Sequence, residues 1–197
     1  FITAPVVDDH GTMLGRITVD DILEVVQEEA SEDILRMGGV SGEETLDTPV
    51  WKSSLQRVAW LSLTLCMAFM SASVIQFFES TISKVVILAA LMPIVAGLGG
   101  NAGGQTMALI VRNIALGETR IMSRSRTLGR EVLIGFLNGL LIGLLTAGVV
   151  YLLTESIGLS LIIFIALVLN LMVAACAGTL FPLLLERIGV EPAIASS

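Results

Sequence analysis

A run of proline, glycine and amide residues interrupts one of the most apolar parts of the chain. It extends from Pro93 to Gln105 and reads PIVAGLGGNAGGQ. Proline and glycine weaken a helix, and hydrocarbon offers no hydrogen bonds, so a broken backbone at membrane depth must be satisfied by protein or water. Asn101 and Gln105 add two amides on one helical face. We therefore expect backbone carbonyls freed by the break, together with the Asn101 side chain, to line a water-filled path for a hydrated cation.

The same run allows two other interpretations. Gly99 and Gly103 have the small-xxx-small spacing that lets two membrane helices approach closely, so the run also fits a tight helix contact. The segment from Gly97 to Ala102 matches a G-x-G-x-x-A nucleotide pattern. A phosphate loop needs a preceding strand and an aqueous crevice, and here the surroundings are an apolar block without a nearby lysine, so nucleotide binding is not expected.

An acidic segment near the N-terminus is the second place where chemistry is expected. Its carboxylates recur every three to four residues, which places several of them on one face of a helix. The acidic residues are Asp20, Asp21, Glu24, Glu28, Glu29, Glu32 and Asp33. Such a run is either a solvated face or a surface where a divalent cation bridges carboxylates, since Mg²⁺ prefers oxygen ligands and keeps several of its waters.

The elements that must position these residues are long apolar helices. The chain has 197 residues, 54% of them hydrophobic, and a mean hydropathy of +0.88. Four apolar blocks are long enough to cross about 30 Å of hydrocarbon: residues 58–78, 85–111, 132–153 and 159–185. The composition predicts an all-α polytopic membrane protein, a helical bundle, with a short α/β remnant at the N-terminus.

Basic residues predict the orientation of these blocks. They gather between the second and third blocks, in a set formed by Arg112, Arg120, Arg124, Arg126 and Arg130. Cytoplasmic loops carry an excess of Lys and Arg, so this loop is expected in the cytoplasm. Four spans then place the N-terminus in the cytoplasm as well.

The polar N-terminal part predicts two short β runs, a turn and a helix. The strands fall within residues 4–19 and are joined by the turn from Asp8 to Gly11, with His10 expected to be exposed there. Thr18 is a candidate helix cap, with acidic residues in the first turn. A linker rich in Gly, Ser, Thr and Pro follows over residues 38–49 and leads into an amphipathic segment, residues 50–60.

Several isolated residues receive structural interpretations. Cys66 and Cys176 lie in apolar blocks, where a thiol packs as a small hydrophobic group. Asn138 and Asn170 lie within spans, where amides commonly form interhelical hydrogen bonds. Glu79 fits either an interfacial carboxylate or an entrance that concentrates cations.

These residues resemble those of a known family, the MgtE magnesium channels. The most specific part is the run from Pro93 to Gln105 continued by ALIVR at residues 108–112, which looks like the family's second transmembrane helix. Support comes from RVAWL at residues 57–61, from the Phe78-Glu79 pair, and from PLLLERIGVEPA at residues 182–193.

The resemblance implies a domain organisation. Residues 1–27 would be the C-terminal part of a CBS domain, residues 28–56 an acidic connecting or plug helix with its linker, and residues 57–190 a transmembrane domain. Residues 191–197 would begin a fifth helix, so the chain is expected to be a fragment of a longer protein.

The resemblance also implies a function and its residues. It implies a homodimer in the cell (inner) membrane whose interfacial pore passes Mg²⁺ into the cytoplasm, with Mg²⁺ as both substrate and regulator. The implied sensing residues, which would bind cytoplasmic Mg²⁺ and close the pore, are Asp21, Glu24, Glu29, Glu32 and Asp33. The implied ion path comprises Gly97, Gly99, Gly100, Asn101 and Glu191.

Other function classes make different demands on the sequence. An alternating-access carrier for another divalent cation, such as Co²⁺, would also use broken helices at mid-membrane. A purely structural scaffold predicts no ion flux. An intramembrane enzyme is not expected, because no span contains a His or a carboxylate pair. No nucleic acid partner is expected.

Overall fold

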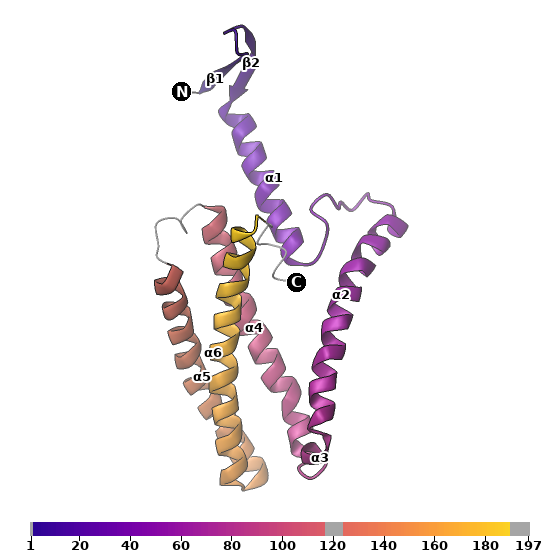
Figure 1. The fold of residues 1–197 in the computed structure, drawn as a ribbon, viewed down its shortest axis with the longest axis vertical. Helices are drawn as coiled ribbons and strands as arrows, with labels where there is room; N and C mark the ends of the chain where they lie inside the picture. The colour runs from indigo at the N-terminus through magenta and orange to yellow at the C-terminus, as the bar shows by residue number, and fades with distance from the viewer. Residues whose placement is uncertain (1, 117–123, 190–197) are drawn as a thin grey trace. The chain divides into compact units, whose positions relative to one another are not determined.

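The computed structural model describes residues 2–116 and 124–189 (Figure 1). The predicted fold class is confirmed: four helices are long and apolar enough to cross a membrane, and a two-stranded sheet lies near the N-terminus. The chain divides into two compact units, one up to Trp60 and the other from Leu61. Glu191 and Arg120 lie outside the described residues.

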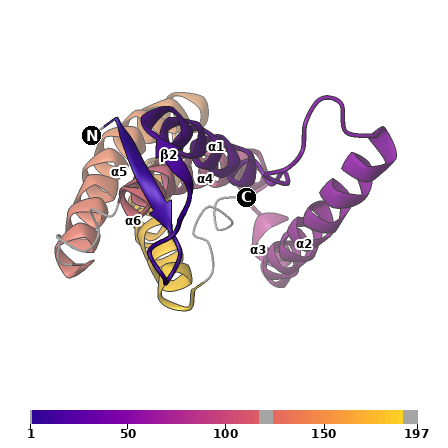
Figure 2. The same ribbon diagram turned by 90° about the horizontal axis from the view of Figure 1, so that it is seen from above.

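The first unit begins with the predicted hairpin. Strand β1 (Thr3–Val7) pairs antiparallel with β2 (Met13–Thr18) (Figure 2). The register is irregular between Val6 and Val7. The turn is held by Asp8, whose Oδ1 accepts hydrogen bonds from the N–H of His10 at 3.0 Å and of Thr12 at 2.7 Å. His10 is exposed there, as predicted.

Helix α1 (Val19–Met37) follows directly and begins at the predicted cap. The Thr18 hydroxyl accepts from the N–H of Asp21 at 3.3 Å, and the Asp21 carboxylate accepts from the N–H of Thr18 at 2.7 Å. This reciprocal capping box satisfies two backbone donors that the first turn of a helix leaves unpaired. The helix continues without a break through residues 27 and 28, where the sequence predicts a domain boundary.

The four predicted spans are all present, and each belongs to a helix that extends beyond the predicted span at one end or at both. The helices are α2 (Val50–Phe77), α4 (Ile87–Ala115), α5 (Arg124–Thr154) and α6 (Ile157–Arg187). A short helix, α3 (Glu79–Ile82), begins at the exposed residue Glu79. Hydropathy locates only the part of a helix that suits hydrocarbon, whereas the backbone continues until a terminating residue. The amphipathic segment before the first span is therefore the start of α2.

The prediction that the backbone breaks in the glycine run is wrong. Helix α4 is continuous from Ile87 to Ala115 with Pro93 inside it. Proline removes a single backbone donor, so the carbonyl of Ala89 loses its helical partner while the rest of the ladder remains. Without water as an alternative partner, the backbone keeps its helical hydrogen bonds even where glycine makes the helix intrinsically weak.

Glycine lets α5 and α6 pack side by side as an antiparallel pair (Figure 1). On α5, Gly135, Gly139 and Gly143 are buried and recur every four residues. A Cβ at Gly139 would lie 2.8 Å from the Cα of Val168, and one at Gly135 would lie 2.7 Å from the Leu171 carbonyl oxygen. Only glycine permits this spacing between the two helices.

Helix α4 packs against α6 by the same device. A Cβ at Gly178 of α6 would lie 2.5 Å from the carbonyl oxygen of Gly103 of α4. An apolar core adds to this packing. In it, Leu91 of α4 packs with Ala147 of α5 and with Ile163 and Leu167 of α6. In contrast, no residue of α2 is buried in the described structure.

The glycine contacts predict the effect of one added methyl group. Gly178→Ala should lower the free energy of unfolding by about 1–3 kcal/mol, because the new Cβ meets a backbone oxygen that cannot rotate away. Gly100→Ala is the matched control, since nothing lies within 4 Å of its Cβ position, and its better helix propensity should stabilise by up to about 1 kcal/mol. Unfolding of the full-length variants in detergent measures both, and equal stability of the two would contradict this account of the α4–α6 contact.

Candidate functional site

The glycines of α4 lie on two different faces of the helix. Gly99 and Gly103 face α6: a Cβ at Gly103 would lie 3.5 Å from the Ala174 carbonyl oxygen. Gly97, Gly100 and Gly104 are exposed, and nothing lies within 4 Å of their Cβ positions. The tight-contact interpretation is therefore correct for the first pair, and the other three form an open face.

Asn101 lies on this open face. Its side chain is exposed, as is that of Gln105 one turn further along α4. We call the surface formed by Gly97, Gly100, Asn101 and Gly104 the open face of α4. It combines a carboxamide with backbone that no side chain covers, because three of its four residues are glycine.

Gly99 has a different environment, determined by Asn170 of α6. The Nδ2 of Asn170 donates a hydrogen bond to the Val95 carbonyl oxygen at 2.8 Å and lies 2.6 Å from the Cβ position of Gly99. The prediction of an interhelical hydrogen bond is confirmed for Asn170. Asn138 makes no side-chain hydrogen bond within the described residues, and the same expectation stays a prediction for it. Its exposed side chain lines a cavity instead.

That cavity contains a carboxylate that the sequence interpretation missed. Glu131, only 3% exposed, lies in α5 next to the predicted start of the third span. Its Oε1 accepts a hydrogen bond from Nη1 of Arg130 at 2.7 Å, and its Oε2 lies 3.5 Å from the Thr106 hydroxyl of α4. The only signal in the sequence is a charged pair at the edge of an apolar block, and such pairs usually lie in water.

The predicted sensing residues are spread along α1 rather than gathered. Asp21, Glu24 and Glu29 are exposed, whereas Glu32 and Asp33 are half-buried. Twelve residues of helix separate Asp21 from Asp33, about 18 Å at 1.5 Å per residue. Among residues 2–116 and 124–189, no group of three or more His, Cys, Asp or Glu side chains is placed to hold a metal ion.

Two of these carboxylates already have local partners, one at the cap of α1 and one within the helix. Hydrogen bonds from the backbone N–H of Thr18, and then from its hydroxyl, lower the pKa of Asp21. The Glu32 carboxylate forms an ion pair with Arg36 one turn later. A cation held at either position would compete with these local contacts.

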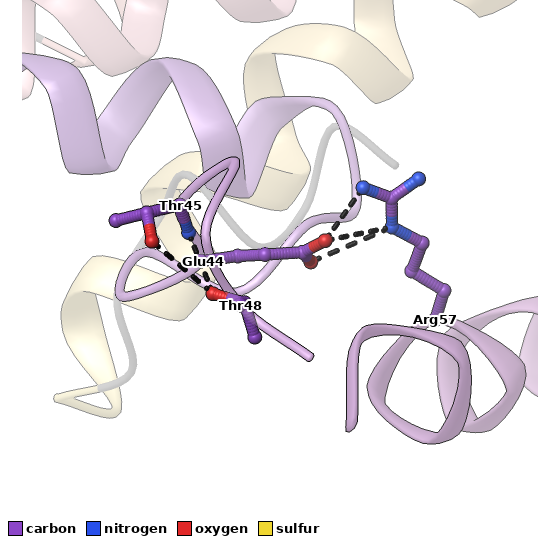
Figure 3. Close-up of polar contacts among 4 residues, drawn as sticks. All are labelled: Glu44, Thr45, Thr48 and Arg57. Carbon is purple, nitrogen blue, oxygen red and sulfur yellow. Dashed lines mark hydrogen bonds and ion pairs between the residues drawn. The ribbon is translucent and has the colours of Figure 1, made fainter. Parts of the chain in front are cut away.

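A further ion pair connects the linker after α1 to the first turns of α2. Nη2 of Arg57 lies 2.6 Å from Oε1 of Glu44, and the Nε of Arg57 donates to the same oxygen at 3.1 Å (Figure 3). The Glu44 side chain is only 5% exposed, and Thr45 and Thr48 hold the next turn through a backbone-to-hydroxyl bond of 3.0 Å. The Arg57 guanidinium keeps the pKa of the Glu44 carboxyl below its ordinary value.

The family model and the individual proteins that match this chain agree with one another. Residues 92–197 match the family model MgtE, described as a divalent cation transporter. Three curated proteins are similar over the full length of this chain, each carrying the name magnesium transporter MgtE. They come from Enterococcus faecalis (35% identical), Thermus thermophilus (34%) and Bacillus subtilis (33%). The chain spans 43–44% of the length of these relatives.

The Glu44–Arg57 pair predicts a pH-dependent linker. Since the folded-state pKa of Glu44 is lowered, its stabilising effect is fully present above the ordinary glutamate pKa and is lost as the pH falls through the folded-state value. Glu44→Gln should reproduce that loss at neutral pH and speed amide hydrogen exchange over residues 43–48 of the full-length protein. Glu43→Gln, at the exposed neighbouring position, is the control, and equal exchange in the two variants would contradict the assignment.

Proposed function

This chain belongs to the MgtE family of divalent cation transporters, and we propose that the complete protein passes Mg²⁺ into the cytoplasm along the open face of α4. The observation that carries this proposal is the exposed position of Asn101 among glycines with no side chain within reach. A membrane helix that faces only lipid has no use for such a polar stripe. Membership of a transport family favours flux over catalysis.

The chemistry of the open face suits a hydrated ion. Mg²⁺ gives up its waters reluctantly, so recognition requires acceptors for the hydrogens of bound water rather than a tight cage. The Asn101 carbonyl oxygen is one acceptor. Each backbone carbonyl at the glycines has a second lone pair that the helical hydrogen bond leaves available, so the face needs no break in the helix to present oxygen.

We propose that a second copy of the chain completes this path. In one protomer, the α4 positions at Gly97 and Gly100 have no neighbour within 4 Å, and a pore needs a wall on its other side. A two-fold axis beside α4 would bring two such faces together, as isologous dimer interfaces require. Gly99 is used differently, since it packs against Asn170 of its own protomer.

The orientation is supported by the helix ends. Arg112 near the end of α4, Arg124 at the start of α5 and Arg187 at the end of α6 belong to one end of this antiparallel bundle. Positive charge at one end favours that end for the cytoplasm. We propose the cell (inner) membrane as the location, with α1 on the cytoplasmic side.

We further propose that cytoplasmic Mg²⁺ closes the path by binding the carboxylates of α1. Because they do not converge within one chain, a cation would have to bridge this helix to another acidic surface of the complete protein. Such a bridge would remove the repulsion between like charges. Glu24 and Glu29, both exposed, are the positions most available for it, and Asp33 is half-buried beside them along the helix.

The ion path predicts the outcome of one substitution in the full-length protein. Asn101→Leu should reduce Mg²⁺ uptake by about tenfold or more, since losing one hydrogen-bond acceptor of a hydrated cation costs roughly 1.5–3 kcal/mol. Asn113→Leu makes the same change on the same helix, rotated by about 120° around its axis, and should leave uptake near the wild-type rate. Unchanged, selective uptake in the Asn101 variant would remove this residue from the path.

The gating proposal has a separate test. Neutralising Glu29, Glu32 and Asp33 together to Gln and Asn should leave currents through the full-length protein open at millimolar internal Mg²⁺, because the bridging cation loses its ligands. Glu28→Gln, on the same helix outside the proposed set, controls for the loss of charge alone. Normal closure of the triple variant at high internal Mg²⁺ would refute sensing by these carboxylates.

A further inference from the structure

A cavity with polar side chains in its wall lies among α4, α5 and α6. Its volume is about 230 Å³, and most of its wall is apolar. Four polar side chains line it: Gln105 and Thr106 from α4, and Glu131 and Asn138 from α5. A cavity between membrane helices that is lined by several oxygen-bearing side chains, one of them a carboxylate, has a different character from the packed core around Leu167.

Glu131 is the one carboxylate among the residues that line this cavity. Its side chain is only 4% exposed, yet only one oxygen has a short contact, the 2.7 Å hydrogen bond from Arg130. The other oxygen has the Thr106 hydroxyl at 3.5 Å, too long for a strong hydrogen bond. A buried carboxylate is costly unless its oxygens are well compensated, and the long contact to Thr106 leaves Oε2 able to accept a further partner.

We propose that this cavity binds a hydrated divalent cation, held by Glu131 from one side and by the amide oxygens of Asn138 and Gln105 from the other. This inference rests on the proposed function, because the transported ion is the cation at hand. It adds a second site within each protomer, distinct from Asn101 and independent of a partner chain. The proposed path along the open face does not itself require a cation site in this cavity.

The size and donor set of the cavity fit such an ion. By the same measure of volume, about 10–15 Å³ holds one water, so the cavity has room for a cation with several retained waters. Carboxylate, amide and water oxygens are the ligands that Mg²⁺ and Mn²⁺ prefer. Arg130 opposes the cation, but its side chain is 58% exposed, and solvent screens an exposed charge.

The position of the cavity gives the site a use. Gln105 lies one turn beyond Asn101 toward the Arg-rich end of α4. A cation leaving Asn101 for the cytoplasm would therefore pass the cavity mouth, where Glu131 supplies the negative charge that the open face lacks. Occupancy of the site would also join α4 to α5 where the Thr106 hydroxyl and the Glu131 carboxylate are 3.5 Å apart.

Anomalous diffraction from crystals of the full-length protein grown with Mn²⁺ tests this proposal, with Mn²⁺ standing in for Mg²⁺. Data collected at the manganese edge should show a peak in the cavity of each protomer. Glu131→Gln should abolish the peak, and Asn138→Leu should raise the Mn²⁺ concentration for half occupancy by about tenfold. Glu186→Gln, at an acidic position outside the cavity, should retain the wild-type peak.

The outcomes separate a cation site from a purely structural carboxylate. A cavity without an anomalous peak in the wild type overturns the proposal, as does a peak that persists in both cavity variants. Should Glu131→Gln fail to fold, Asn138→Leu still decides, since it leaves the Arg130–Glu131 pair intact. Asn101→Leu should keep the cavity peak whatever it does to uptake, so a failure of the ion path and a failure of this site give different results.

Discussion

The rest of the membrane unit depends on the close approach of α4 and α5 to α6. Lipid tails are as apolar as leucine, so apolar burial does little to hold membrane helices together, and backbone packing must do so. At Gly139 and Gly178, the backbone of the neighbouring helix occupies the place where a Cβ would stand. These glycines fix the distance between the helices, and the distance in turn determines which side chains of α4 can face inward.

The rotation of α4 follows from this constraint. Because Gly103 must face Gly178, and Gly99 must leave room for Asn170, the intervening residues Gly100 and Asn101 are turned away from α6. The same rotation directs Thr106 toward Glu131 of α5. Helix α4 therefore has a packing face and a polar face. On the packing face, glycines let two helix backbones come together. On the polar face, other glycines leave the backbone uncovered beside an amide.

The sequence predicts the elements of this fold better than their contacts. Block length and hydropathy locate all four spans, and the hydrogen-bonding capacity of Thr18 and Asp21 predicts the start of α1, because these signals are local. The prediction for the glycine run fails because the conformation of this run depends on its surroundings and not only on local signals. Propensity in water predicts a break after Pro93, whereas hydrocarbon offers the backbone no alternative partner and α6 supports the helix along one side. Which glycines face α6 depends on helix rotation, which no local pattern reveals.

Acidic residues that stand out in the sequence need not lie close together in the structure. The carboxylates of α1 attract notice because they are many, yet a single helix keeps Asp21 and Asp33 about 18 Å apart. Glu131 is one charge at the edge of an apolar block, where hydropathy assigns it to water. Its burial arises from Thr106, 25 residues earlier in the chain, and from the approach of α4 and α5 to a common neighbour. The burial of this carboxylate therefore depends on the close packing of helices through glycine, and the charge pattern of the sequence does not reveal it.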